Sequence, residues 1–154
     1  IQTTLSAETE YHRAITHIDA TGVGTSPADI ARTEGIRINP VIFAMATDAR
    51  DRAGMLRMRN YRAWLWWNMR DILDPDRGDD IALPPDQELL ADLTAPRWKM
   101  TASGVQIEDK DEIINRIGRS PDSAEAVILA FFPYMPTGII AHRQEAKRRA
   151  GFGL

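Results

Sequence analysis

The feature that most constrains the fold is an early alternation of helix-like and strand-like segments. In chain order these are the end of a helix (AETEYHRAI, 7–15), a buried strand (THIDAT, 16–21), a helix (SPADIARTEG, 26–35) and a second strand (RINPVIFAM, 37–45). The helix between the strands has clear end signals, because Ser26 suits the N-cap, Pro27 the first helical position and Gly35 the stop. This order predicts an α/β fold built on a parallel, right-handed unit.

The rest of the chain predicts mostly helices. Apolar residues recur at helical spacing in NYRAWLWWNMRDILD (60–74). We then expect a short strand and a helix in IALPPDQELLADL (81–93), a hairpin in RWKMTASGVQIED (97–109), a helix in KDEIINRIG (110–118) and a last helix in SPDSAEAVILAFF (120–132). In the last helix Ser120 is the expected N-cap, with Pro121 in the first turn. We expect one domain, 1–154, that ends in a basic helix or tail at 133–154.

Composition excludes several classes of protein. There is no cysteine, which excludes disulfides, thiolate zinc sites and cysteine nucleophiles. No signal peptide is visible, and the longest apolar run (126–132) is far shorter than the about 18 residues that a membrane span needs. The loop DPDRGDD (74–80) departs from a calcium-binding EF-hand loop, because Gly78 stands at its fifth position and Pro85 at its twelfth.

The net charge of −3 does not suggest a protein that holds nucleic acid by bulk electrostatics. Basic residues nevertheless cluster in two places. One cluster holds Arg50, Arg52, Arg57, Arg59 and Arg62, and the other holds Arg143, Lys147, Arg148 and Arg149. These residues form either a positive face or the solvated sides of amphipathic helices.

Three carboxylates are candidate metal ligands. Asp122 and Glu125 are three residues apart in the first turn of the last helix, so both project from one face. Acids in a first turn also complement the helix dipole, which is the alternative interpretation. Asp19 stands where a parallel strand ends, which is the edge at which open α/β sheets bind their ligands. If the last helix packs across that edge, three carboxylates converge, and such an all-oxygen site suits Mg²⁺ or Mn²⁺.

The stretch HIDATGVG (17–24) also has to be weighed as a nucleotide-binding turn. It supplies two glycines of the G-x-G-x-x-G pattern, but Pro27 stands at the third position and the aspartate precedes the glycines. No phosphate-binding loop of the G-x-x-x-x-G-K-[ST] type occurs in the chain. A nucleotide-binding α/β domain therefore remains an alternative that rests on a partial motif.

In its ordered motifs the sequence resembles the C-terminal nuclease domain of the large subunit of tailed-phage terminases, which has an RNase H-like fold. The resemblance runs from Ile15 to about Phe132. It is carried by HIDATGVG, NYRAWLWWNMRDIL, IALPPDQELLADLTAPRWKMTASGVQIEDKDE and GRSPDSAEAVILAF. The set is most specific where LPPDQELLADLTAPRW is followed by GRSPDSAEAVILA.

The resemblance assigns roles to the carboxylates. The acid that ends the strand is a metal ligand in that family, which corresponds to Asp19. The last helix of the family has the pattern S-P-D-x-A-D-A-L-V-L-A, and its second aspartate corresponds to Glu125. Because Glu is one methylene longer than Asp, either the site geometry adjusts or Asp122 takes part. Lys110, at the start of the preceding helix, either contacts a DNA phosphate or is solvated.

A second departure concerns the first residues. The chain starts at Ile1 rather than Met, so we expect an excised or processed piece. The family's first metal aspartate lies on an opening strand of the nuclease fold. We expect the piece to begin after that strand, and therefore to have an RNase H-like fold without its first strands. We likewise expect the piece to leave out the ATPase domain that precedes the nuclease in the family. We therefore expect the piece alone to be nearly inactive in Mg²⁺, with its opening sheet edge exposed.

The resemblance implies a metal-dependent endonuclease that cuts concatemeric double-stranded DNA during phage genome packaging. Its cofactors would be two Mg²⁺ or Mn²⁺ ions. Its partners would be DNA, the terminase ATPase domain, the small terminase subunit and the portal protein, in the cytoplasm of the bacterial host and without a membrane. The alternative is a non-catalytic assembly module that contacts DNA or capsid proteins through the basic C-terminal segment.

Overall fold

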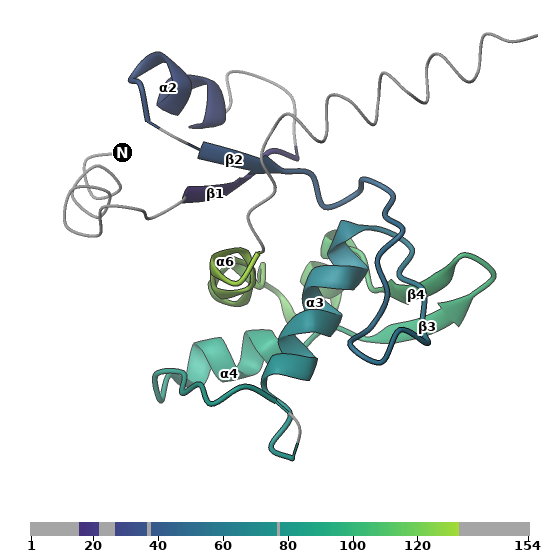
Figure 1. Cartoon of the computed structure of the whole chain (residues 1–154). Coiled ribbons are helices and arrows are strands. Elements are labelled where there is room, and N and C mark those ends of the chain that lie inside the picture. The colour runs from purple at the N-terminus through teal and green to yellow at the C-terminus, as the bar shows by residue number, and fades with distance from the viewer. Residues whose placement is uncertain (1–15, 22–26, 37, 77, 133–154) are drawn as a thin grey trace, which may run out of the picture.

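A computed structural model describes residues 16–21, 27–36, 38–76 and 78–132. Its elements are β1 (Thr16–Asp19), α2 (Pro27–Thr33), β2 (Ile38–Val41), α3 (Tyr61–Ile72), α4 (Gln87–Thr94), β3 (Trp98–Thr101), β4 (Gly104–Ile107), α5 (Lys110–Ile117) and α6 (Asp122–Ala130) (Figure 1). The predicted helix end at 7–15, the N-cap role of Ser26 and the predicted tail at 133–154 lie outside the described residues. None of the helices in the described part is long and apolar enough to span a membrane.

The predicted parallel unit is present. β1 pairs with β2 in parallel, and Asp19, the last residue of β1, is in register with Val41. Helix α2 connects the two strands and ends before Gly35, whose φ of 73° is the left-handed conformation expected at a helix stop. The two strands place the Asp19 carboxylate at the carboxyl end of this sheet.

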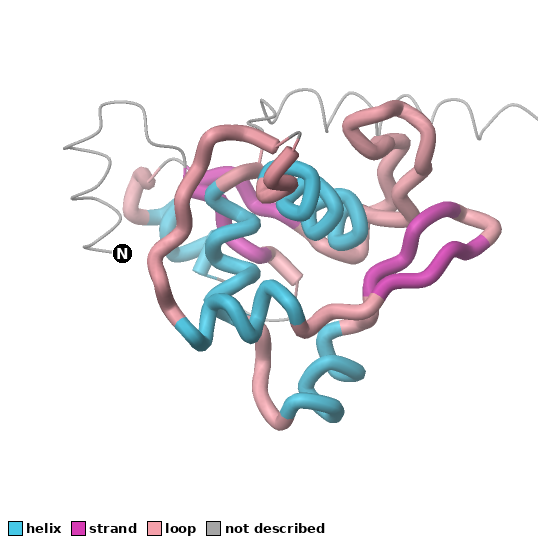
Figure 2. The backbone as a smooth tube through the Cα atoms, turned by 90° about the horizontal axis from the view of Figure 1, so that it is seen from below, coloured by secondary structure: helices cyan, strands magenta, loops and turns pink. Residues whose placement is uncertain are grey.

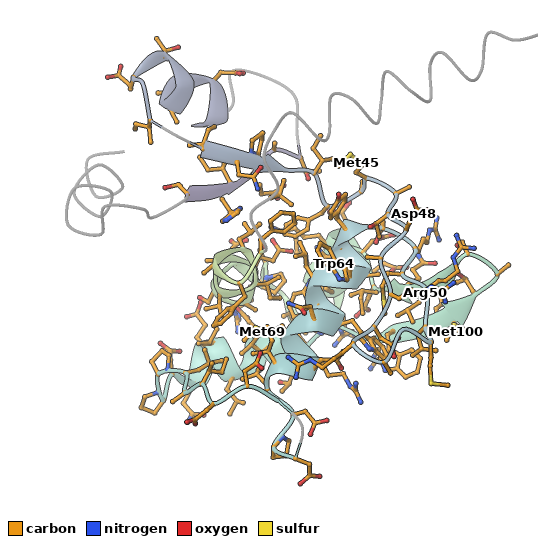
Figure 3. The ribbon with its side chains drawn as sticks, viewed as in Figure 1. Met45, Asp48, Arg50, Trp64, Met69 and Met100 are labelled. Carbon is orange, nitrogen blue, oxygen red and sulfur yellow. The ribbon has the colours of Figure 1, made fainter. Side chains whose placement is uncertain are left out.

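Helix α3 is at the centre of the core. Asn60 caps it by accepting a hydrogen bond from the backbone N–H of Ala63. Met69 is buried and Trp64 packs against the same cluster from its edge (Figure 3). Helix α6 lies between α3 and α4 on one side and the β1–β2 pair on the other (Figure 1). The first turn of α6 is therefore carried on an element that contacts both parts of the fold.

The antiparallel hairpin β3–β4 projects from this body (Figures 1 and 2). Residues 57–59 pair with the outer edge of β4 near the turn of the hairpin, because the N–H of Val105 donates to Arg57 and its C=O accepts from Arg59. Glycine is required at 104, since φ is 113° and a Cβ atom there would lie 2.3 Å from the carbonyl oxygen of Arg57.

Two local predictions were wrong. Residues 81–83 form no strand, because no other segment pairs with them in the described part and Pro84 and Pro85 follow at once. Ser120 is not the N-cap of the last helix. Pro121 takes that place, with a ψ of 51° that is not helical, and the Ser120 hydroxyl donates to the Asp122 carboxylate instead.

Candidate functional site

The first turn of α6 carries the two helix carboxylates, and one ammonium group bridges them. Lys110 Nζ, from the first residue of α5, donates to Asp122 Oδ1 at 2.9 Å and to Glu125 Oε2 at 2.7 Å. The two acids therefore share a face of the helix, as their spacing predicted. They differ in exposure, since 75% of the Asp122 side chain is exposed and only 7% of that of Glu125.

Glu125 is held by a second cation on its other oxygen. Arg62 Nη1, from the first turn of α3, donates to Glu125 Oε1 at 2.8 Å, and both side chains are 7% exposed. Arg62 Nε also donates to the carbonyl oxygen of Glu108 at 3.0 Å. The expectation that the first basic cluster is solvated or forms a positive face is thus wrong for Arg62, which is a core residue.

The hydrogen bonds shift the pKa values of this cluster. Partial burial acts to lower the pKa of Lys110, but the bonds to Glu125 and Asp122 outweigh it, so the pKa is raised. The hydrogen bond from Ser120 and then that from Lys110 lower the pKa of Asp122. Around neutral pH the ammonium is therefore charged and the Asp122 carboxylate ionised, which is the state that keeps the bridge together.

Asp19 lies at the end of β1, on the strand that contacts α6. Its Oδ1 accepts a hydrogen bond from the backbone N–H of Thr21 at 2.8 Å, which closes a tight turn after the strand. The Thr21 hydroxyl in turn accepts from the N–H of Phe43, just beyond β2, at 3.4 Å. The carboxylate of Asp19 thus points into the turn at the strand edge where the sequence analysis expected a ligand.

The structure does not gather the three predicted carboxylates into one group. Asp122, Glu125 and Lys110 are in direct contact, whereas Asp19 has its hydrogen bond to Thr21. Across residues 16–21, 27–36, 38–76 and 78–132, no set of three or more His, Asp or Glu side chains is arranged to hold a metal ion. Carboxylates are suitable donors for Mg²⁺ and Mn²⁺. As placed here, with both oxygens of Glu125 bound by cations, they do not make up a metal centre.

His17 is a residue near this edge that the sequence analysis did not single out. It lies two residues before Asp19, so both side chains are on one face of β1. Its ring packs 5.2 Å from that of Phe132, and its Nδ1 accepts from Asn39 Nδ2 at 3.0 Å. Burial lowers the pKa of His17, which favours the neutral ring. The sequence did contain a signal for His17, because the period of two along a strand puts residues 17 and 19 on the same face.

The nucleotide-binding alternative concerns residues that are mostly outside the described part. Residues 22–26, which include both glycines of the partial motif, lie outside the described part. That alternative remains a prediction from the sequence.

Comparison with solved structures identifies the fold. A structure of the nuclease domain of the large terminase subunit gp2 of bacterial virus Sf6 aligns with a TM-score of 0.60 and 21% identity, over 84% of this chain and 70% of that one. A mutant of the same domain with manganese and β-thujaplicinol aligns with a TM-score of 0.61, with the same identity and coverage. The chain has the fold of a terminase nuclease domain.

A further structure, a mutant of the same Sf6 subunit with calcium, aligns with a TM-score of 0.60 at 20% identity, over 84% of this chain and 69% of that one. No protein-family model and no curated protein matched the chain. The expected RNase H-like class of fold is therefore confirmed by structure rather than by sequence similarity. At 20–21% identity the match establishes the fold of the chain and not the chemistry of its site.

Proposed function

We propose that the chain is a nuclease domain of a phage genome-packaging terminase and that it hydrolyses double-stranded DNA. The observation that carries this proposal is the shared fold over 84% of the chain. It is supported by the packing of α6, which bears Asp122 and Glu125, against the strand that ends at Asp19. These are the two places where the sequence resemblance puts acidic residues.

We further propose that the activity depends on Mg²⁺ or Mn²⁺, with two ions in a complete site. Such ions activate a water molecule and stabilise the leaving oxygen of a phosphodiester. Asp19, Glu125 and Asp122 are the proposed ligands and catalytic acids. Lys110 is the proposed contact to a DNA phosphate, because 38% of its side chain is exposed beside the acids. The cutting of concatemers, the other terminase components as partners and the host cytoplasm as location belong to the same proposal.

The second candidate is a non-catalytic assembly module with this fold. Two observations favour it. Both oxygens of Glu125 are bound by protein cations, and the described residues hold no three-acid group. Such a module would bind DNA or a capsid protein without a metal requirement.

Nicking of supercoiled plasmid by a molar excess of the purified chain separates these candidates. We expect slow conversion to nicked circles in Mn²⁺, none in EDTA and none with Asp19→Asn. Glu125→Ala is expected to abolish nicking and Asp122→Ala to weaken it, and the reverse order would move the helix ligand to Asp122. We also expect Mn²⁺ to raise the melting temperature of the wild type but not that of Asp19→Asn. DNA retention without metal, no nicking and equal Mn²⁺ shifts in both proteins would instead favour the assembly module.

A further inference from the structure

We propose that Arg62 is a positioning residue for Glu125. It holds Oε1 in the core and thereby turns Oε2 toward the surface, where Lys110 and Asp122 lie. This inference rests on the proposed nuclease function, because it concerns the orientation of an acid that the function places in the active site.

Contacts other than the one to Glu125 also hold the Arg62 side chain in place. The backbone N–H of Arg62 donates to the carbonyl oxygen of Phe43 at 2.9 Å, and Nε donates to that of Glu108 at 3.0 Å. The centre of the guanidinium lies 5.8 Å from the ring of Phe43 and 5.9 Å from that of Trp66. The backbone bond to Phe43, the bond from Nε to the Glu108 carbonyl and the two aromatic rings together hold Arg62. The orientation of its side chain is therefore set by the core and not by solvent.

Both partners of the Arg62–Glu125 ion pair are buried. Arg62 Nη1 and Glu125 Oε1 are 2.8 Å apart, and the two residues come from α3 and α6, which pack on each other. A charge-assisted bond in a low-dielectric environment is short and directional. Glu125 in α6 is therefore oriented by an element that carries none of the other proposed acids.

The two oxygens of Glu125 have different environments. Oε1 faces a guanidinium whose side chain is 7% exposed, whereas Oε2 faces Lys110, whose side chain is 38% exposed and which also binds the largely exposed Asp122. A ligand that arrives from solvent would therefore meet Oε2. If Arg62 were absent, the longer side chain of glutamate could rotate and this distinction would be lost.

Arginine is required for this arrangement because two directed donors are used at once. Nε bonds to the Glu108 carbonyl while Nη1 bonds to the carboxylate. A lysine at this position would keep the charge but could not reproduce the planar two-point geometry. Arg62→Lys is therefore the informative variant, and Arg62→Met removes the charge as well.

The experiment measures plasmid nicking by wild type, Arg62→Lys and Arg62→Met, with the same proteins checked for folding by circular dichroism. Arg70→Lys is the matched control, because Arg70 lies on the same helix but is largely exposed over the Trp67 ring. With the chain in molar excess over plasmid, kcat is the maximal nicking rate and KM the protein concentration that gives half of it. We expect Arg62→Lys to stay folded and to lose roughly tenfold to a hundredfold in kcat, with KM changed by less than about twofold. Arg70→Lys should match the wild type. A rate that falls only with the folded fraction, or a rise in KM alone, would overturn the proposal.

A double-mutant cycle tests the positioning role of Arg62 independently of the proposed nuclease function. Melting temperatures are measured for Arg62→Lys, Glu125→Gln and the double variant. We expect strong coupling, so that Arg62→Lys costs little once Glu125→Gln is present. Additive shifts would refute the positioning role whether or not DNA is cut. Strong coupling with no nicking by the wild type would refute the nuclease function while the orientation of Glu125 by Arg62 stands.

Discussion

At the residue scale, two arginines of the described part lie in different environments that the sequence alone did not separate. Arg62 is buried against Glu125, whereas Arg116 forms its ion pair with Glu108 at the surface of α5. A signal for the first was present, because Arg62 precedes Leu65, Trp66 and Met69 at spacings of three, four and seven residues. A cation in an apolar stripe of this kind predicts a buried acid as its partner.

The pair between Glu108 and Arg116 makes a prediction about pH. Arg116 donates from Nε at 3.1 Å and from Nη2 at 2.5 Å to the two carboxylate oxygens. The hydrogen bond from Arg116 is the main cause that holds the pKa of Glu108 below its ordinary value. A lowered folded-state pKa adds stability that is present above the ordinary carboxyl pKa of about 4.3 and is lost as the pH falls through the folded value.

We therefore expect Glu108→Gln to have a lower free energy of unfolding than the wild type at pH 7. At a pH below the lowered pKa of Glu108 the two free energies should be equal. The measurement is urea unfolding at several pH values between neutral and strongly acidic. Asp76→Asn is the control, because Asp76 forms no ion pair among the described residues. A stability difference that stays constant down to low pH would contradict the role of this ion pair.

At the element scale, most helices and the hairpin could be predicted because their signals are local. Asn60, Asp86 and Asp109 are capping residues, and Gly118 adopts the left-handed conformation after α5. The strand expected at 81–83 failed for a reason that no local pattern contains. Ile81 and Leu83 do alternate toward the core, but a strand needs a partner, and the described part offers none there.

Gly104 makes a prediction about how the hairpin joins the body. Gly104→Ala must place a Cβ atom 2.3 Å from the Arg57 carbonyl oxygen and keep a φ of 113°, so it should destabilise the fold by about 3 kcal/mol. Gly54→Ala is the matched control. Gly54 has a φ of 73° but no atom within 4 Å of the added group, so only the conformational cost of about 1 kcal/mol remains. Equal losses in urea unfolding would contradict the close approach of hairpin and loop.

At the scale of the whole molecule, the candidate site depends on a contact between parts that are far apart in sequence. The acids of α6 could be proposed from their spacing, and Lys110 from the family resemblance, but the distance from α6 to Asp19 could not. This distance depends on how β1 packs on the helical body. Phe132 contacts both β1 and α3 and so joins these two parts. Its ring lies 5.2 Å from that of His17 in β1 and 5.8 Å from that of Trp64 in α3.

Phe132→Ala should therefore loosen the β1–β2 pair from the helical body and separate Asp19 from α6. Phe132 is buried, and loss of its ring should cost about 3 kcal/mol. Amide hydrogen exchange should accelerate most in β1 and β2, while the β3–β4 hairpin, with which Phe132 makes no ring contact among the described residues, keeps its protection. Phe131→Ala is the matched control, since Phe131 is the exposed neighbour. Equal acceleration in both sheets would show that Phe132 stabilises the whole fold rather than this junction, and the placement of Asp19 beside α6 would then need another cause.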